Sequence, residues 1–255
     1  MIRLDALAAD AGVRHAFFTR QGGLSDGQFA SLNCGFGSGD AADRVADNRT
    51  IAMQRLGLSA DRLVTCYQIH GDRVVTVEHA WRRQEAPRAD AMVTCVPGIA
   101  LGILTADCAP VLFVDPAARV IGATHGGWRG ALGGVLDATI RRMEELGAGR
   151  RHIRAGIGPC IGRDSYEVGP EFEEAFATAD PANRVFFAPA ARSGHFVFDM
   201  AGYIERRLAG LGVAAIDSAR CDTVADEARF FSYRRACLRG ETAYGRGLSA
   251  IALAP

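Results

Sequence analysis

The chain has 255 residues, of which 49% are hydrophobic and 23% are charged, the ordinary composition of a globular protein. Its 29 basic and 29 acidic side chains give a formal net charge of zero. This balance argues against a nucleic-acid-binding protein, which needs surplus basic groups to displace the counterions of the phosphates. Every basic side chain is arginine, since the sequence contains no lysine. Schiff-base aldolases, pyridoxal-phosphate enzymes and P-loop ATPases need a lysine amine and are therefore excluded.

The sequence also gives no sign of a membrane or export segment. The longest apolar stretch, Ile99 to Val114, is interrupted by Asp107 and a proline, and it falls short of the roughly 18 uninterrupted residues that a membrane helix requires. Asp5 and Asp10 stand where a signal peptide would be apolar. We expect a cytoplasmic protein with no membrane partner, whose seven scattered cysteines are reduced thiols.

The predicted elements follow from the spacing of apolar residues. Short apolar-rich runs predict strands at Leu63–Gln68, Val74–Glu78, Ala91–Thr94, Leu101–Thr105, Val111–Asp115, Val120–Thr124 and Ile153–Ile157. Helical periodicity predicts helices at Arg44–Leu56, Gly130–Leu146, Pro170–Thr178 and Asp199–Leu208. Strands that cluster in the middle of the chain, with helices between and after them, indicate a mixed α/β or α+β fold with at least one central sheet.

Three segments carry metal-ligating residue types at predicted strand ends: His70 in QIHG, Cys108 in TADCAP and His125 in THGGWRG. Strand ends are usual places for sites, because the sheet fixes the side chains while loops admit substrate. Two histidines and one cysteine suit a catalytic zinc, which keeps three protein ligands and an open fourth position. A metal-free interpretation uses the same residues, with Cys108 as a nucleophile and His70 or His125 as its base.

Each of these residues also has an ordinary structural interpretation. A single histidine is more often a hydrogen-bonded structural residue than a metal ligand, and a single cysteine is most often a core thiol. The three residues are separated by 38 and 17 positions, which match no local zinc signature. Only their joint occurrence beside small residues favours a common site.

Arginines flanked by glycines form a second group. Arg20 lies in TRQGG, which is followed by Asn33 in SLN, and Arg129 is surrounded by glycines before the helix expected from Gly130. Exposed backbone N–H groups can hold an anion, and arginine matches phosphate geometry. The alternative is that TRQGG is simply a turn. A third group, GIGPCIG, places Cys160 at a glycine-rich strand exit, but it lacks the third glycine of a dinucleotide fingerprint.

Taken together, these segments resemble the multicopper polyphenol oxidase (laccase-domain) family, the YfiH-like proteins. The resemblance rests on FFTRQGGLS with SLN, YQIHGDRV, ADAMVT, LTADCAPVLF, THGGWRG, GIGPCIG with SYEV, FDM and FFSYRR, and so spans residues 17 to 235. Two positions depart from the family pattern: Gly126 stands where alanine is common and Asp222 where threonine is common.

The resemblance implies an α+β fold of the CNF1/YfiH-like type, layered α/β/β/α with mixed sheets, in one domain over residues 1–255. It implies a zinc site on His70, Cys108 and His125. It also implies activity on purine nucleosides with phosphate: phosphorolysis of adenosine, inosine, guanosine or methylthioadenosine, and deamination of adenosine. Some family members are linked to the editing of peptidoglycan precursors, and the family name implies copper-dependent phenol oxidation.

The histidine content argues against multicopper laccase chemistry. A blue-copper site together with a trinuclear cluster needs about ten histidines with paired HxH motifs. This chain has six histidines and no HxH motif. The His₂Cys set can still bind copper adventitiously, because copper outcompetes zinc at most sites.

For the nucleoside reactions we expect His70, Cys108 and His125 to be both ligating and catalytic, with Asp107 as a proton carrier or a partner of the ligands. We expect Arg20 and Asn33 to contact substrate, Arg20 by gripping phosphate, with Arg129 orienting nearby groups and Cys160 lining the pocket. Two alternatives remain: a cysteine hydrolase or amidase using Cys108, and a non-enzymatic zinc site closed by Cys160 as a fourth ligand. The sequence indicates no oligomeric state.

Overall fold

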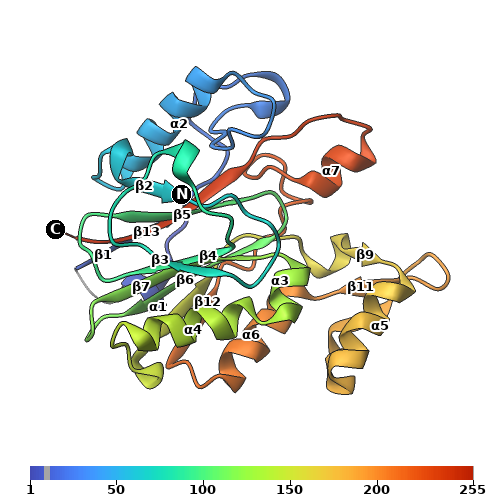
Figure 1. Ribbon diagram of the computed structural model, residues 1–255. Helices are drawn as coiled ribbons and strands as arrows, with labels where there is room; N and C mark the ends of the chain where they lie inside the picture. The colour runs from blue at the N-terminus through green and yellow to red at the C-terminus, as the bar shows by residue number, and fades with distance from the viewer. Residues whose placement is uncertain (9–11, 255) are drawn as a thin grey trace.

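The computed structural model describes residues 1–8 and 12–254 of the chain. Asp10 and the last residue of the expected 1–255 domain lie outside the described residues. Two large mixed sheets stack on each other, and helices cover their outer faces (Figure 1). This confirms the expected α+β class and the α/β/β/α order of layers. Within residues 1–8 and 12–254, no helix is both long and apolar enough to cross a bilayer.

The upper sheet has four strands, in the spatial order β1 (Val13–Phe17), β13 (Gly247–Leu253), β5 (Ala100–Thr105) and β2 (Leu63–Thr65). Only β2 and β5 run parallel; the other neighbours are antiparallel. Helix α2 (Ala42–Arg55) covers the outer face of this sheet, and a cluster of buried apolar side chains fills the space between them. The heptad-like spacing of apolar residues in α2 puts its buried side on the sheet.

The lower sheet has six strands, with parallel pairs only at its two edges. Their spatial order is β12 (Ala215–Ser218), β8 (Arg154–Ile157), β6 (Ala109–Asp115), β7 (Val120–Gly126), β4 (Ala91–Thr94) and β3 (Val74–Thr76). Strands β6 and β7 are buried along their whole length. Continuous apolar runs such as these are expected when both faces of a strand are covered, here by the upper sheet and by helices.

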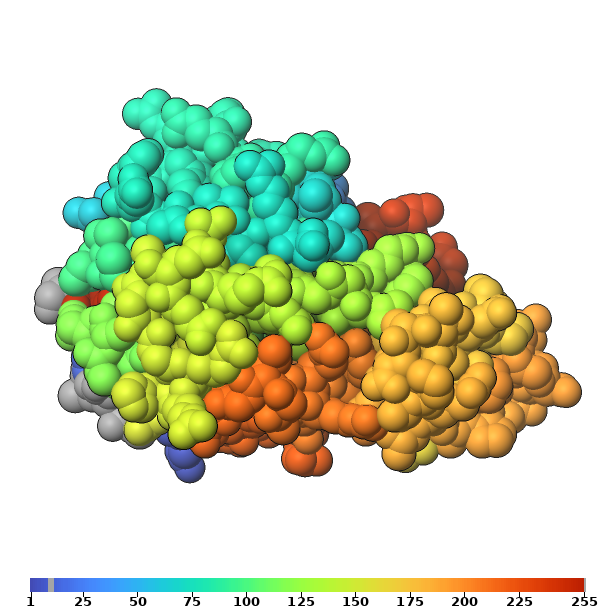
Figure 2. Space-filling model, turned by 60° about the horizontal axis from the view of Figure 1, so that its bottom comes forward, coloured from blue at the N-terminus to red at the C-terminus, as the bar shows by residue number. Residues whose placement is uncertain are grey.

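Helices α4 (Val135–Glu145) and α6 (Met200–Gly210) cover the outer face of the lower sheet, where Figure 2 shows them lying across the surface. Beside them, α5 (Pro170–Ala179) packs on a small sheet and forms a lobe at one end of the molecule (Figures 1 and 2). That sheet consists of β10 (Phe187–Pro189), β11 (Phe196–Phe198) and β9 (Glu167–Val168). Stacked and edge-on phenylalanine rings hold the lobe together.

The remaining helices of the described residues are short. The α-helical ones are α1 (Asp5–Ala8), α3 (Trp128–Gly133) and α7 (Tyr233–Leu238). The 3₁₀ turns among the described residues are Gly27–Phe29, Ala60–Arg62, Arg83–Glu85, Arg150–His152, Arg163–Ser165 and Pro181–Phe186.

The seven predicted strands and four predicted helical segments are present; Ala91–Thr94 has the predicted ends, and the others have at least one shifted end. The segment predicted as one helix, Gly130–Leu146, is two helices, because Gly134 adopts a left-handed conformation with φ of 97° between α3 and α4. Helix α3 begins at Trp128 rather than Gly130, so the predicted helix start is wrong by two residues. Strands β1, β9 to β13 and helix α7 were not predicted.

Candidate metal centre

His70, Cys108 and His125 converge at the junction of the two large sheets. His70 lies in the loop that leads from β2 in the upper sheet to β3 in the lower sheet, Cys108 lies in the turn between β5 and β6, and His125 lies on β7. Their ligand atoms all lie within 4.8 Å of one another. Cys108 Sγ lies 4.0 Å from His70 Nε2, and the two imidazole rings meet edge to face with centroids 4.7 Å apart.

His125 is held in a single orientation by Asp90. Its Nδ1 lies 2.8 Å from Asp90 Oδ1, and its backbone N–H donates to the Asp90 carbonyl at 2.7 Å. Both side chains are buried. Because the two nitrogens of an imidazole point in opposite directions, this contact leaves Nε2 free to act as a ligand, as is usual for metal-binding histidines.

The same carboxylate fixes the loop that carries His70. Asp90 accepts the backbone N–H groups of Ile69, His70 and Gly71 at 3.1, 2.9 and 2.8 Å. Burial alone would raise the pKa of Asp90, but the hydrogen bonds from His125 and the backbone outweigh it and hold the pKa below its usual range. Asp90 therefore carries a charge and positions two of the three candidate ligands.

Gln68 anchors the start of this loop. Its side-chain amide donates to the Leu104 carbonyl at 2.8 Å and accepts the Leu104 N–H at 2.9 Å, so it continues the ladder beyond the end of β2 at Thr65. The loop can then turn sharply, and His70 takes a positive φ of 59°. Such a conformation is uncommon outside glycine and recurs at sites held by their surroundings.

Asp107, next to Cys108, ties the turn to Thr223 and to the first turn of α7. Its Oδ1 accepts from Thr223 Oγ1 and its Oδ2 accepts from the Arg234 N–H, both at 2.6 Å. Burial raises the pKa of this carboxyl group above its usual range. These contacts show Asp107 holding α7 close to Cys108, while its role as a proton carrier stays a prediction.

The charges of Cys108 and His125 are coupled. Burial would raise the pKa of the Cys108 thiol, but the adjacent His125 and His70 outweigh it and lower that pKa. Conversely, burial would lower the pKa of His125, and the Cys108 and Asp90 charges raise it instead. The surroundings therefore favour the thiolate, which is the form of cysteine that ligates metal.

The residues around the three ligands fit a small metal ion. A Cβ atom built at Gly127 would lie 2.8 Å from His70 Cδ2 and 3.4 Å from Cys108 Sγ. Only glycine leaves room there for the three side chains to stay in place. In a tetrahedral zinc site, sulfur and nitrogen ligands are separated by about 3.6 Å, close to the 4.0 Å between Cys108 Sγ and His70 Nε2. The donor set is equally acceptable to copper, so the geometry does not select one metal.

Two cavities with different linings reach this centre. A cavity of about 420 Å³ is lined by His70, Cys108 and Asp107 together with Trp128, Arg129, Tyr166, Phe172, Tyr233 and Arg234. We call it the aromatic cavity. A second cavity, of about 620 Å³, is lined by all three candidate ligands and by Arg49, Arg83, Arg88 and Arg246. We call it the arginine cavity.

Two of the predicted substrate-binding residues have clear positions. Arg129 lines the aromatic cavity, with its guanidinium 4.5 Å from the centre of the Trp128 ring. Cys160 is buried in the core beneath the lower sheet and lines neither cavity, and burial raises the pKa of its thiol. Its sulfur is not among the ligand atoms that converge on the centre. The structure therefore gives no support to Cys160 as a fourth ligand.

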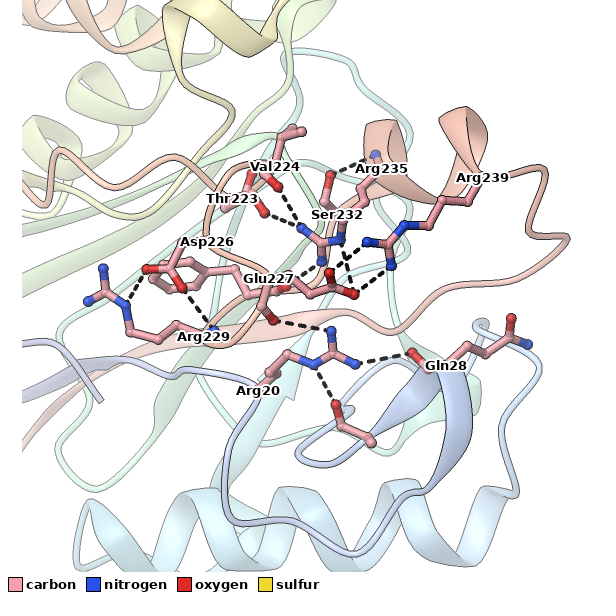
Figure 3. A network of polar contacts seen from close by, with 12 residues as sticks. Arg20, Gln28, Thr223, Val224, Asp226, Glu227, Arg229, Ser232, Arg235 and Arg239 are labelled. Carbon is pink, nitrogen blue, oxygen red and sulfur yellow. Dashed lines mark hydrogen bonds and ion pairs between the residues drawn. The ribbon is translucent and has the colours of Figure 1, made fainter.

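Arg20 and Asn33 lie in loops that neither cavity reaches. The Arg20 guanidinium donates to the carbonyls of Ala30 and Glu227, among others, at 2.5 and 3.4 Å (Figure 3). It also lies 4.4 Å from the centre of the Phe231 ring. The buried Asn33 amide donates to Ser38 and Asp40. These contacts favour structural roles, and the substrate roles expected for both residues stay predictions.

Asp90 and the four arginines of the arginine cavity are site residues that were not predicted from the sequence. Asp90 had a detectable signal, because it lies within the apolar segment ADAMVT, directly before the strand that begins at Ala91, and a buried carboxylate needs partners. The four arginines had no such signal, since they come from three segments that only the folded chain brings together: α2, the connection between β3 and β4, and the chain just before β13. Asp222, one of the two departures from the family pattern, accepts from Ser165 Oγ at 2.5 Å and from the Gly162 N–H at 3.0 Å.

Comparison with known proteins decides the family. The model of a family described as multi-copper polyphenol oxidoreductase laccase matches residues 14–254. The chain belongs to this family. Among its relatives is a purine nucleoside phosphorylase of Deinococcus radiodurans, 41% identical over 89% of this chain and 86% of the relative.

Solved structures of the family share the fold. A Neisseria meningitidis protein of the DUF152 family is 36% identical, with a TM-score of 0.86 over 96% of each chain. The YfiH protein of Bacillus licheniformis is 29% identical, with a TM-score of 0.87 over 94% of this chain and 92% of that one. The resemblance to YfiH-like proteins stated from the sequence motifs is thus confirmed.

Proposed function

We propose that this family member catalyses the phosphorolysis of purine nucleosides at His70, Cys108 and His125. The observation that carries the proposal is the convergence of these three side chains at a point reached by two cavities, one aromatic and one cationic. A purine ring and a phosphate need walls of these two kinds. The name of the Deinococcus radiodurans relative supports the same activity.

We further propose zinc as the metal. His70, Cys108 and His125 would hold the ion, and Asp90 would fix the positions of His70 and His125. The side of the ion that faces the two cavities would have no protein ligand and would be open to substrate. When bound, the ion would supply a Lewis acid in the site. The Cys108 thiolate and the two imidazoles together suit zinc better than the oxygen-preferring cations.

In phosphorolysis, an oxygen of the hydrogen phosphate dianion forms a bond to the anomeric carbon of the ribose. The bond from that carbon to the purine nitrogen breaks, its electron pair stays on the purine, and one phosphate proton ends on the base. The products are the free purine and ribose 1-phosphate. We assign the purine to the aromatic cavity, where Tyr166 and Trp128 offer ring faces and Arg129 and Asp107 offer polar groups.

We propose adenosine, inosine, guanosine and methylthioadenosine as substrates. We also propose that the same site deaminates adenosine: water adds to the purine carbon that bears the amine, ammonia leaves, and inosine is formed. Asp107 is the proposed proton carrier for both reactions, because it is a buried carboxyl group on the wall of the aromatic cavity beside Cys108.

A product assay tests these reactions. Zinc-loaded protein is incubated with adenosine in the presence and absence of phosphate, and the products are separated by chromatography. We expect adenine only with phosphate, inosine with or without it, and neither product from Cys108→Ala. Turnover that persists after the metal is removed would contradict the metal-dependent mechanism.

One geometric relationship favours a second candidate function, a cysteine hydrolase or amidase. Cys108, His125 and Asp90 stand in the order nucleophile, base and orienting carboxylate, with 2.8 Å between His125 Nδ1 and Asp90 Oδ1. This order is the one used by cysteine and serine hydrolases. A peptidoglycan precursor is the substrate to try first.

Chelation separates the two candidates. A cysteine hydrolase should keep its activity after a chelator removes metal and lose it on alkylation of Cys108 by iodoacetamide. The phosphorylase should lose activity on chelation, without unfolding, and recover it when zinc is restored. Circular dichroism before and after chelation shows whether the fold is retained.

A further inference from the structure

The arginine cavity concentrates positive charge without a balancing carboxylate. Of the residues that the structure describes, four arginines and no aspartate or glutamate line it. Within the part of the chain that the structure describes, Arg49, Arg83, Arg88 and Arg246 form no ion pair. In a chain with equal numbers of acidic and basic groups, this is a pronounced local excess of positive charge.

Aromatic rings hold these guanidinium groups in place. The Phe36 ring lies between Arg49 and Arg83, with guanidinium carbons 4.5 and 4.4 Å from its centre. Arg88 lies over Tyr67 at 5.3 Å, and Arg246 lies over Tyr244 at the same distance. A guanidinium that stacks by its face keeps its N–H edge available, and that edge is the part that binds an oxyanion.

Arg49 is the most enclosed of the four. Its Nε donates to the Cys34 carbonyl at 2.9 Å and its Nη1 to Thr65 Oγ1 at 3.5 Å. Burial, aided by repulsion from Arg83, lowers its pKa to about 10, so it remains a cation at neutral pH. A cation placed in such surroundings without a carboxylate is unfavourable unless an anion joins it.

We infer that the arginine cavity binds the phosphoryl dianion of inorganic phosphate or of a phosphate monoester. The cavity is lined by His70, Cys108 and His125 as well as by the four arginines, so an anion held there lies beside the candidate metal centre. As the phosphate of the reaction, it would approach from the arginine cavity and leave the aromatic cavity to the purine. That catalytic role rests on the proposed function, whereas the anion site does not.

Calorimetric titration with phosphate, without nucleoside, tests the anion site. The test uses the double variant Arg83→Gln/Arg88→Gln, because both side chains are exposed, stack on aromatic rings and form no ion pair within residues 1–8 and 12–254. We expect its phosphate affinity to fall by about tenfold or more, as two charge-assisted contacts are lost. Arg141→Gln, on the exposed side of α4 and outside both cavities, removes a like charge and should bind phosphate as the wild type does.

Ribose 5-phosphate in the same titration distinguishes the two sources of the anion. Binding of inorganic phosphate alone assigns the cavity to the free anion, and tighter binding of the ester assigns it to a phosphorylated sugar. Either result supports a phosphoryl site. Equal affinity of the wild type and the double variant for both anions would overturn it.

Steady-state kinetics then tests the catalytic role. In the double variant we expect the KM for phosphate to rise by about tenfold or more, while the KM for the nucleoside changes by less than about twofold. A rise in the nucleoside KM instead would contradict the division between the two cavities. Phosphate binding without any phosphorolysis would overturn the proposed function and leave the anion site standing.

Discussion

Asp90 Oδ1 lies 2.8 Å from His125 Nδ1 and also accepts the backbone N–H of His70 at 2.9 Å. One buried carboxylate therefore orients two candidate ligands that are 55 residues apart in the chain. Cys108 needs no such support, since it sits in the tight turn between two central strands. The orientation of His125 and of the loop that carries His70 therefore depends on Asp90.

We expect Asp90→Asn to weaken zinc binding by about 10- to 100-fold, the usual cost of losing a partner that orients a ligand. The amide can still accept one or two N–H bonds, but it has no charge to stabilise and polarise His125. Competition with a chromophoric chelator measures the affinity directly.

Asp115→Asn is the matched control for this substitution. Asp115 is also a fully buried carboxylate that accepts three backbone N–H groups, those of Ala117, Ala118 and Gly149 at 2.9, 3.1 and 2.7 Å. It lines neither cavity. The Asp115→Asn substitution should lower the free energy of unfolding without changing zinc affinity. Equal zinc affinities of the Asp90→Asn and Asp115→Asn variants would argue against the orienting role of Asp90.

Gly127→Ala should displace a ligand. The added methyl group would stand 2.8 Å from His70 Cδ2, too close to be accommodated without movement of the imidazole. We expect zinc affinity to fall by about tenfold or more. Gly133→Ala is the control, because no atom lies within 4 Å of its Cβ position. It should keep zinc affinity and add up to about 1 kcal/mol to the free energy of unfolding, since alanine favours the helix.

Arg20→Ala should affect stability rather than phosphate binding. The substitution removes the donors that satisfy the Ala30 and Glu227 carbonyls and the stacking on Phe231. We expect the free energy of unfolding in urea to fall by about 1–3 kcal/mol. The affinity for phosphate should match the wild type; a large loss of affinity with unchanged stability would restore the phosphate role expected from the sequence.

His15 should make the fold sensitive to mild acid. It is buried, its Nε2 accepts the Leu4 N–H at 2.9 Å, and burial, with Arg3 nearby, lowers its pKa to about 4. The folded state thus holds His15 neutral, while the unfolded chain protonates it near pH 6.5. The contribution of neutral His15 to the free energy of unfolding is fully present above pH 6.5 and is lost as the pH falls toward 4.

Between pH 7 and pH 5 the wild type should therefore lose about 2 kcal/mol through His15. Urea unfolding in excess chelator measures this without a contribution from metal binding. In His15→Gln, which keeps an acceptor but does not titrate, that part of the pH dependence should disappear. A pH dependence identical to that of the wild type would mean that His15 is not the responsible group.

The sequence predicted the parts of the fold that have a strong local pattern. Strands β4 to β7 are nearly continuous apolar runs, so they were found, and His125 and Cys108 were placed correctly at their ends. Strand β13 is rich in glycine, alanine and serine, which have weak strand preference, and it was missed although it lies inside the upper sheet.

The site features that could not be predicted from the sequence are those formed by residues far apart in the chain. The arginines that line the arginine cavity come from positions 49 to 246. No local spacing in the sequence indicates that they lie together in the fold. Conversely, Arg20 and Asn33 looked like ligand contacts because they stand beside glycines and polar residues. Loop segments need the same residue types to satisfy their own backbone groups. Arg20 donates to the Ala30 carbonyl, and Asn33 Oδ1 accepts the Gly35 N–H.

The position of the three ligands between the two sheets has a dynamic consequence. His70 belongs to the crossing from the upper to the lower sheet, and His125 belongs to a central strand of the lower one. An ion shared by both would couple the opening of one layer to that of the other. Amide hydrogen exchange along β2 and β4 should then slow together on metal loading, so that both layers exchange as one cooperative unit.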